Sequence, residues 1–329
     1  MLETRFTKLV GCTVPIQQAG MGAAAPPALA CAVSEAGGLG MVGTARPGMN
    51  PGTLAGLLSQ TRDLTNRAFG VNFIPRHYPD MMREFVELAA KAGRVVECFY
   101  TEPDAELVKI IHGHGALASW QVGSREEAVK AAEVGCDIIV AQGVEAGGHV
   151  RGTLGLLALL CDVLDAVPEI PVLAAGGIGT GRAMAAVLAA GADGVRVGTR
   201  FVASEEADLH PIYTDALIAA RAEDSVYGST FHVGWPEAPH GTLRSAIEAA
   251  QAFEGEVVAK VLSLDGTERM VPRFGTSVAD RSATGHIQAM ALYAGQSVGA
   301  VKRVAPAREI IQEMVMEAEK LLRRSRYAT

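Results

Sequence analysis

The sequence of 329 residues has few aromatic side chains, no excess of basic residues and no paired cysteines. Aromatic residues make up 5 %, and 29 Lys and Arg stand against 36 Asp and Glu, for a net charge of −7. Such a chain lacks both the basic surface and the stacking platforms that bind nucleic acids. Its five cysteines form no CxxC pair, which argues against a disulfide framework and against a structural zinc site.

Long hydrophobic runs are also absent. No segment approaches the ~18 apolar residues of a membrane span, and the first residues, Met1–Arg5, lack the apolar stretch of a secretory signal. We therefore expect a soluble, cytoplasmic protein that associates with neither membranes nor nucleic acids. Hydrophobic residues nevertheless make up 49 % of the chain, which is enough to fill the core of one barrel domain or of two smaller domains.

The sequence does contain a repeated unit, in which a helical segment ends at a glycine and a short apolar strand follows. Gly135, for example, ends one such helix and precedes Asp137–Val140; glycine suits this position because it adopts the left-handed conformation easily. The strands are apolar without alternation, which is typical of parallel strands buried on both faces. The eight predicted strands are Pro15–Gln18, Leu39–Val42, Phe69–Phe73, Arg94–Cys98, Ala116–Trp120, Asp137–Ala141, Pro171–Ala175 and Asp193–Val197.

Eight alternating strand–helix units in the first ~200 residues favour a closed (β/α)8 TIM barrel, an α/β fold, over an open doubly wound sheet. The rhythm changes after residue 204, where stretches rich in Gly, Pro and His separate helical patterns. We predict a TIM barrel over residues 1–204 plus 302–329. A smaller, mainly helical domain over residues 205–301 is inserted before the last helix, which we expect over Val304–Arg326 and which would return to the barrel as its eighth.

The loops after the last two predicted strands are rich in glycine. They contain Gly176-Gly177 and Gly198-Thr199, and loops at these two positions commonly hold phosphate in TIM barrels. Backbone N–H groups at such glycines approach an anion closely, because no Cβ stands in the way, and Thr199 adds a hydroxyl. The alternative, that these glycines only form tight turns, is disfavoured by their coincidence at both phosphate-holding positions.

His149 is the histidine best placed for chemistry, because it alone lies on a predicted loop at the carboxyl end of a strand with flexible glycines before it. Gly147 and Gly148 would let the backbone approach a flat ligand and present the imidazole to it. An imidazole titrates near neutral pH and suits proton transfer. The alternative is a loop histidine that only forms hydrogen bonds. No spacing of metal ligands or of a Ser-His-Asp triad is present.

Together these motifs resemble the nitronate monooxygenase family, also called the 2-nitropropane dioxygenase family. The resemblance rests on Gln142–His149, Ala174–Ile178 and Gly198–Phe201, and covers essentially the whole chain. Further matching segments are Pro15–Met21, Glu35–Gly40, Phe69–Asn72 and Tyr293–Ser297. The resemblance implies FMN at the top of a TIM barrel, with His149 as the catalytic residue. The implied cofactor-binding residues are Met21, Gly22, Asn72, Gln121, Gln142, Gly147, Gly148, Gly176, Gly177, Gly198, Thr199, Gln296 and Ser297.

The same motifs also resemble FMN-dependent enoyl-acyl carrier protein reductases and NADH:quinone reductases. The leading hypothesis is oxidation of small alkyl nitronates or nitroalkanes with O2, in which His149 removes a proton from the nitroalkane. The alternative is NAD(P)H-dependent reduction of an enoyl thioester or a quinone, with His149 as the proton donor. A non-catalytic flavin- or phosphate-binding barrel would leave His149 unexplained. The expected partners are a small-molecule substrate and O2 or NAD(P)H, and a homodimer stays open.

A mononucleotide is expected rather than FAD. The two glycine-rich loops would form a single phosphate pocket, and the sequence has no separate strand-Gly-x-Gly-x-x-Gly-helix unit for the pyrophosphate of a dinucleotide.

Overall fold

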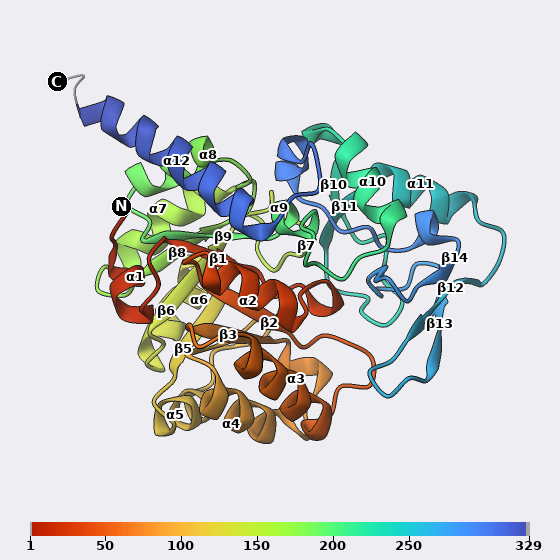
Figure 1. Ribbon diagram of the computed structural model, residues 1–329, viewed down its shortest axis with the longest axis horizontal. Coiled ribbons are helices and arrows are strands. Elements are labelled where there is room, and N and C mark those ends of the chain that lie inside the picture. Colours follow the sequence, from red (N-terminus) through yellow and green to blue (C-terminus); the bar gives the residue numbers. More distant parts are fainter. Residues whose placement is uncertain (1, 327–329) are drawn as a thin grey trace.

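A computed structural model describes residues 2–326 and has eight parallel strands in one sheet (Figure 1). The strands are β1 (Ile16–Gln18), β2 (Gly40–Gly43), β3 (Phe69–Phe73), β4 (Val95–Cys98), β5 (Leu117–Val122), β6 (Ile138–Gln142), β8 (Val172–Ala175) and β9 (Gly194–Val197). Their order is β1-β9-β8-β6-β5-β4-β3-β2. Leu39 joins the two end strands, because its N–H donates to Ile16 O and its carbonyl accepts from Gln18 N–H, both at 2.9 Å. The predicted barrel is confirmed.

Helices surround this barrel and connect its strands. They are α2 (Pro27–Glu35), α3 (Pro51–Leu64), α4 (Met82–Ala92), α5 (Ala105–Gly113), α6 (Arg125–Glu133), α7 (Leu156–Ala166), α8 (Gly181–Ala189) and α12 (Ala307–Arg326). Several start where a short polar side chain accepts a first-turn N–H, as Asn50, Asp104 and Thr180 do. The last helix, α12, packs against both α8 and α2, so it completes the ring of helices. None of the helices in residues 2–326 is long and apolar enough to cross a bilayer.

The amino-terminal end of the barrel is closed by the short helix α1 (Arg5–Val10). Phe6 and Val10 of α1 are buried in an apolar cluster with side chains from the barrel strands. Arg5 anchors the helix through two hydrogen bonds to the carboxylate of Asp193, at 2.7 and 2.8 Å. Apolar packing fills this end, which leaves the opposite end, where the strands finish, for function.

Residues 205–301 lie outside the barrel, on the right of Figure 1. Two predicted helical segments are present as α10 (Pro211–Ala219) and α11 (Arg244–Ala252), but the description as mainly helical is incomplete. Two three-stranded sheets accompany the helices, in the orders β10-β11-β7 and β13-β12-β14. Their strands are β7 (Gly148–His149), β10 (Ser225–Gly228), β11 (His240–Leu243), β12 (Val257–Leu262), β13 (Glu268–Pro272) and β14 (Thr284–Gly285). These strands are short, and β7 pairs with a segment about 90 residues away, so their signal in the local sequence is weak.

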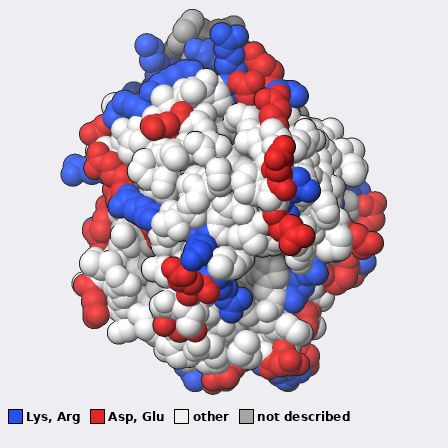
Figure 2. All heavy atoms as spheres, turned by 90° about the vertical axis from the view of Figure 1, so that its right-hand side faces the viewer, with Lys and Arg blue, Asp and Glu red and all other residues white. Residues whose placement is uncertain are grey.

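One of these sheets attaches the segment to the barrel. Strand β7 lies in the loop that follows β6, and it pairs antiparallel with β11, placing His240 opposite His149 and Gly241 opposite Gly148. The segment therefore covers the carboxyl end of the barrel at the predicted catalytic loop. On the face that it presents in Figure 2, basic and acidic side chains are interspersed among uncharged residues rather than gathered into a basic patch.

Candidate active site

A cavity of about 520 Å³ lies at the carboxyl ends of the barrel strands, beneath residues 205–301. Its volume falls in the range of small-molecule and cofactor sites. The sequence-predicted residues that line it are Met21, Gly22, Asn72, Gln121, Gln142, Gly147, Gly148, His149, Gly176, Gly177, Gly198, Thr199 and Ser297. Gln296 lies outside the cavity: its side chain is exposed, and its N–H donates to Glu145 O at 2.9 Å. Segments as far apart in the sequence as Met21 and Ser297 thus meet in one cavity.

Two adjacent glycines in the loop after β6 have different roles. A Cβ on Gly147 would collide with the backbone nitrogen of Gly295, so this glycine allows two chain segments to pass closely. Gly148 has φ of +71° and would meet nothing within 4 Å of an added Cβ. It therefore leaves open space on the cavity wall, where a flat group can approach the backbone.

The predicted phosphate loops lie together on another part of the wall. Gly177 has φ of +68°, a conformation that favours glycine, and Gly198 has only Ala19 and Met21 within 4 Å of an added Cβ. Thr199 supports the approach of a further segment, since its Oγ1 accepts from the N–H of Gly295 at 3.0 Å. The hydroxyl proton of Thr199 remains to donate to an anion.

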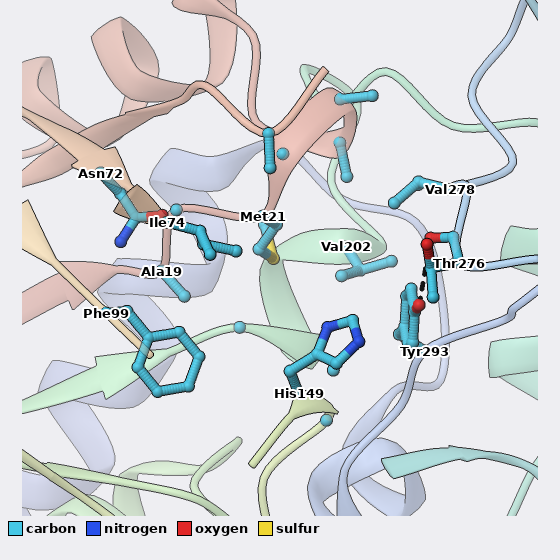
Figure 3. A pocket seen from close by; sticks show the side chains of 18 of the residues that line it. Ala19, Met21, Asn72, Ile74, Phe99, His149, Val202, Thr276, Val278 and Tyr293 are labelled. Atoms are coloured by element: carbon cyan, nitrogen blue, oxygen red, sulfur yellow. Dashed lines mark hydrogen bonds between the residues drawn. The ribbon is translucent and has the colours of Figure 1, made fainter. Parts of the chain in front are cut away.

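His149 is held by its backbone, and its buried ring nitrogen Nε2 has no hydrogen-bond partner among the described residues. The side-chain nitrogen of Gln142 donates to His149 O at 3.1 Å, and β11 pairs with the same residue. His149 Nε2 and Gln142 Oε1 are buried atoms without hydrogen-bond partners among the described residues. Figure 3 shows His149, Met21 and Phe99 converging from separate elements of the fold. Buried polar atoms are normally paired, so these two atoms indicate the place of a ligand.

An aromatic wall surrounds the imidazole and keeps it neutral. The ring of Trp235 stacks on His149 with centroids 4.0 Å apart, and the ring of Tyr293 lies 5.5 Å away. Burial, together with the nearby His240, His77 and Arg76, lowers the pKa of His149 to about 3. At neutral pH the imidazole of His149 is therefore uncharged.

His240 is a structural histidine, in contrast to His149. One ring nitrogen, Nδ1, lies 2.9 Å from Ala238 O, and Nε2 accepts the N–H of Phe231 at 3.1 Å. Burial lowers the pKa of His240 as well. Both nitrogens are occupied, so His240 has no free atom for a substrate.

A charged network forms the floor of the cavity and was missed by sequence reasoning. Arg196 on β9 pairs with Glu97 on β4 at 2.8 Å across the barrel, and it also donates to Gln121 Oε1. Glu97 in turn accepts from Asn72 at 2.8 Å and from Gln17 at 2.9 Å. The available signal was a charged residue between apolar neighbours in each of two predicted strands: Glu97 follows Val96, and Arg196 lies between Val195 and Val197.

These features fit a flat, polar-edged group that ends in a phosphate. The floor supplies amides and charges for the edge of a ring, Gly148 leaves room for its face, and the glycine loops surround an anion. Unpaired Gln142 Oε1 and His149 Nε2 lie on the same wall. The cavity thus offers both donors and acceptors, and its lining fits a flavin mononucleotide.

The model of the nitronate monooxygenase family matches residues 3–317. The chain belongs to this family. Membership of the nitronate monooxygenase family, a family of oxidoreductases, identifies the chain as an enzyme, and the resemblance inferred from the loop motifs is confirmed.

Relatives within and around the nitronate monooxygenase family carry several activities in their names. A Rhodococcus jostii protein named (3aS,4S,5R,7aS)-5-hydroxy-7a-methyl-1-oxo-octahydro-1H-indene-4-carboxyl-CoA dehydrogenase is 36 % identical over 230 residues, which are 68 % of this chain and 62 % of that protein. The match therefore spans less than two thirds of that relative's length. FabK from Thermotoga maritima superposes with a TM-score of 0.83 and 30 % identity over 100 % of both chains. Nitroalkane oxidase from Streptomyces ansochromogenes superposes with a TM-score of 0.75 and 27 % identity, over 96 % of this chain and 98 % of that one.

Proposed function

We propose that the protein is an FMN-dependent oxidoreductase that oxidises small alkyl nitronates and nitroalkanes with O2. The observation that carries the proposal is His149: its Nε2 is buried and unpartnered, and its low pKa keeps the ring neutral. A neutral imidazole on the wall of a cofactor-sized cavity is suited to accept the α-proton of a nitroalkane. Membership of the nitronate monooxygenase family supports the same substrate class.

The cavity residues divide into groups that would hold different parts of FMN. Gly177, Gly198 and Thr199 would bind the phosphate through backbone N–H groups and a hydroxyl. Asn72 and Gln121 on the floor would meet the polar edge of the ring system. The bound FMN would accept two electrons from the nitronate and pass them to O2.

The protein's own contribution is to position the substrate and to move one proton. In a neutral nitroalkane the C–H bond next to the nitro group breaks, the proton goes to His149 Nε2, and the electron pair remains on the nitronate. Trp235 and Tyr293 exclude water around the imidazole, which strengthens the electrostatic interactions within the site. A preformed nitronate needs no such step.

The test is anaerobic reduction of the purified, flavin-loaded protein with nitronates, NADH and NADPH, followed by the absorbance of the flavin. Bleaching by a nitronate but not by NADH or NADPH supports the proposal. Bleaching by NAD(P)H alone overturns it. A yellow protein that none of these reductants bleaches would instead be a non-catalytic flavin carrier.

The second candidate is an NAD(P)H-dependent FMN reductase acting on an enoyl thioester or a quinone. It is favoured by the Rhodococcus jostii relative, whose name specifies a carboxyl-CoA substrate, and by the superposition on FabK over the whole chain. It ranks second because the family model that matches residues 3–317 is that of the nitronate monooxygenases.

A further inference from the structure

The ion pair between Glu97 and Arg196 lies inside the barrel, away from water. Its side chains are 0 % and 6 % exposed, and among the ion pairs of residues 2–326 no other has both side chains below 10 %. Removing two charges from water is costly, and a buried pair is often no more stabilising than apolar residues of similar volume. Folding stability therefore does not explain why the barrel contains this pair.

The pair does determine how two amides of the cavity floor are turned. A carboxylate only accepts hydrogen bonds, so Asn72 must direct its nitrogen to Glu97, at 2.8 Å, and is left with its oxygen as a free acceptor. A guanidinium only donates, so Gln121 must direct its oxygen to Arg196 and is left with its nitrogen as a free donor. Figure 3 shows the oxygen of Asn72 on the side of the other lining residues and its nitrogen on the opposite side.

Both amides line the cavity, and both bond to the same ion pair. The polar edge of an isoalloxazine ring is an imide, in which an N–H stands between two carbonyl groups. The free oxygen of Asn72 can accept from the imide N–H, and the free nitrogen of Gln121 can donate to an imide carbonyl. Two amides that were free to turn could present either an oxygen or a nitrogen to the ring. A fixed polarity lowers the cost of ordering the floor when the ring binds.

We propose that Glu97 and Arg196 are positioning residues, which hold Asn72 as an acceptor and Gln121 as a donor toward the imide edge of FMN. The proposal rests on FMN as the cofactor. It assigns the pair to cofactor recognition rather than to stability, and the two roles predict different responses to mutation.

The decisive variant is the double substitution Glu97→Met and Arg196→Met, which removes both charges and nearly keeps the volume. Since an apolar pair of similar size is often neutral or stabilising, the flavin-free variant should melt at the same temperature as the flavin-free wild type or higher. Its dissociation constant for FMN, from titration of the apoprotein by flavin fluorescence, should rise about 10- to 100-fold.

The conservative variant Glu97→Gln is the matched control. Its oxygen can still face Asn72 and Arg196, and its new amide nitrogen can face Gln17, whose own Oε1 has no partner and can be turned to accept. The polarity of Asn72 and Gln121 is then preserved. Glu97→Gln removes the counter-charge of Arg196 and should melt at a lower temperature than the wild type, but it should keep most of the FMN affinity that the double variant loses.

Three outcomes contradict the proposal. A double variant that melts lower and binds FMN as tightly as the wild type makes the pair purely structural. If Glu97→Gln and the double variant lose the same FMN affinity, the charge of Glu97 matters for FMN binding rather than the orientation of Asn72 and Gln121. A wild-type apoprotein that does not bind FMN removes the proposed function as well, and is thereby distinguishable from the other two.

Discussion

Replacing Trp235 by Ala should restore the titration of His149. The indole is 3 % exposed and covers the imidazole at 4.0 Å, and it is itself covered by the guanidinium of Arg76 at 4.7 Å. Burial is the largest cause of the low pKa, ahead of His240, His77 and Arg76. An alanine would admit water to one face of the ring, so the pKa should rise from about 3 toward the ordinary value.

The size of the effect follows from the two protonation equilibria. With a pKa of about 3, more than about 99 % of the imidazole is neutral at a pH of about 5.5, so lowering the pH from about 7.5 removes almost no base. With an ordinary pKa of about 6.5, the neutral share falls from about 90 % to about 10 % over the same interval, which is a roughly tenfold loss. This loss is an upper limit, because it assumes that the pKa returns fully to its ordinary value. His240, His77 and Arg76 remain in Trp235→Ala and continue to lower the pKa.

Two measurements test this reasoning. Two-dimensional NMR of the histidine ring C–H groups, with His149→Asn to assign the signal, should show no titration of wild-type His149 between about pH 5 and 8. Anaerobic flavin reduction by a neutral nitroalkane should be flat over this range in the wild type and fall at acid pH in Trp235→Ala. Trp235→Phe keeps the stacked ring and should stay flat. A wild-type His149 that titrates near its ordinary pKa would refute the argument.

Further expectations concern the proton transfer and the glycine-rich walls. His149→Asn should slow flavin reduction by a neutral nitroalkane by roughly 10²–10⁴-fold, with a much smaller loss for the preformed nitronate; equal losses in stopped-flow traces would leave His149 a positioning residue. Gly148→Ala should cost about 1–2 kcal/mol for the left-handed backbone and also block FMN, because its Cβ enters open space on the cavity wall; full retention of FMN on gel filtration would contradict this. Gly147→Ala should instead lower the melting temperature through overpacking of about 1–3 kcal/mol against Gly295, and an unchanged melting curve would show that the backbone adapts. Thr199→Ala should loosen FMN only modestly and cost about 1 kcal/mol through the lost bond to Gly295; extraction of FAD from the pure protein would count against the mononucleotide.

The barrel was predictable because its signals are local. A parallel strand buried on both faces is a short, mostly apolar run, and Phe69–Phe73 is the same in the prediction and in the structure. Barrel topology then brings the ends of all such strands together. Gly176 and Gly198 could therefore be assigned to one cavity from their positions in the chain, and both line it. Binding of FMN by these residues stays a prediction.

The structure alone decided what surrounds His149 and what lies beneath the cavity. Trp235 and His77 are distant in sequence, and neither has a local pattern that places it against the imidazole. Strand β11 pairs with a two-residue strand about 90 residues earlier, which no local propensity encodes. Gln296 matches a family motif, but its side chain is turned outward.

The pair of Glu97 and Arg196 likewise has one property that the sequence determines and one that only the tertiary structure decides. The sequence by itself determined that Glu97 and Arg196 stand in buried strands, where a charge without a partner would be too costly to keep. It did not determine that each is the partner of the other. Their strands are not neighbours in the sheet, and the side chains meet only across the closed barrel. Closure is a property of all eight strands together, so the contact, and the turning of Asn72 and Gln121 that depends on it, exists only in the tertiary structure.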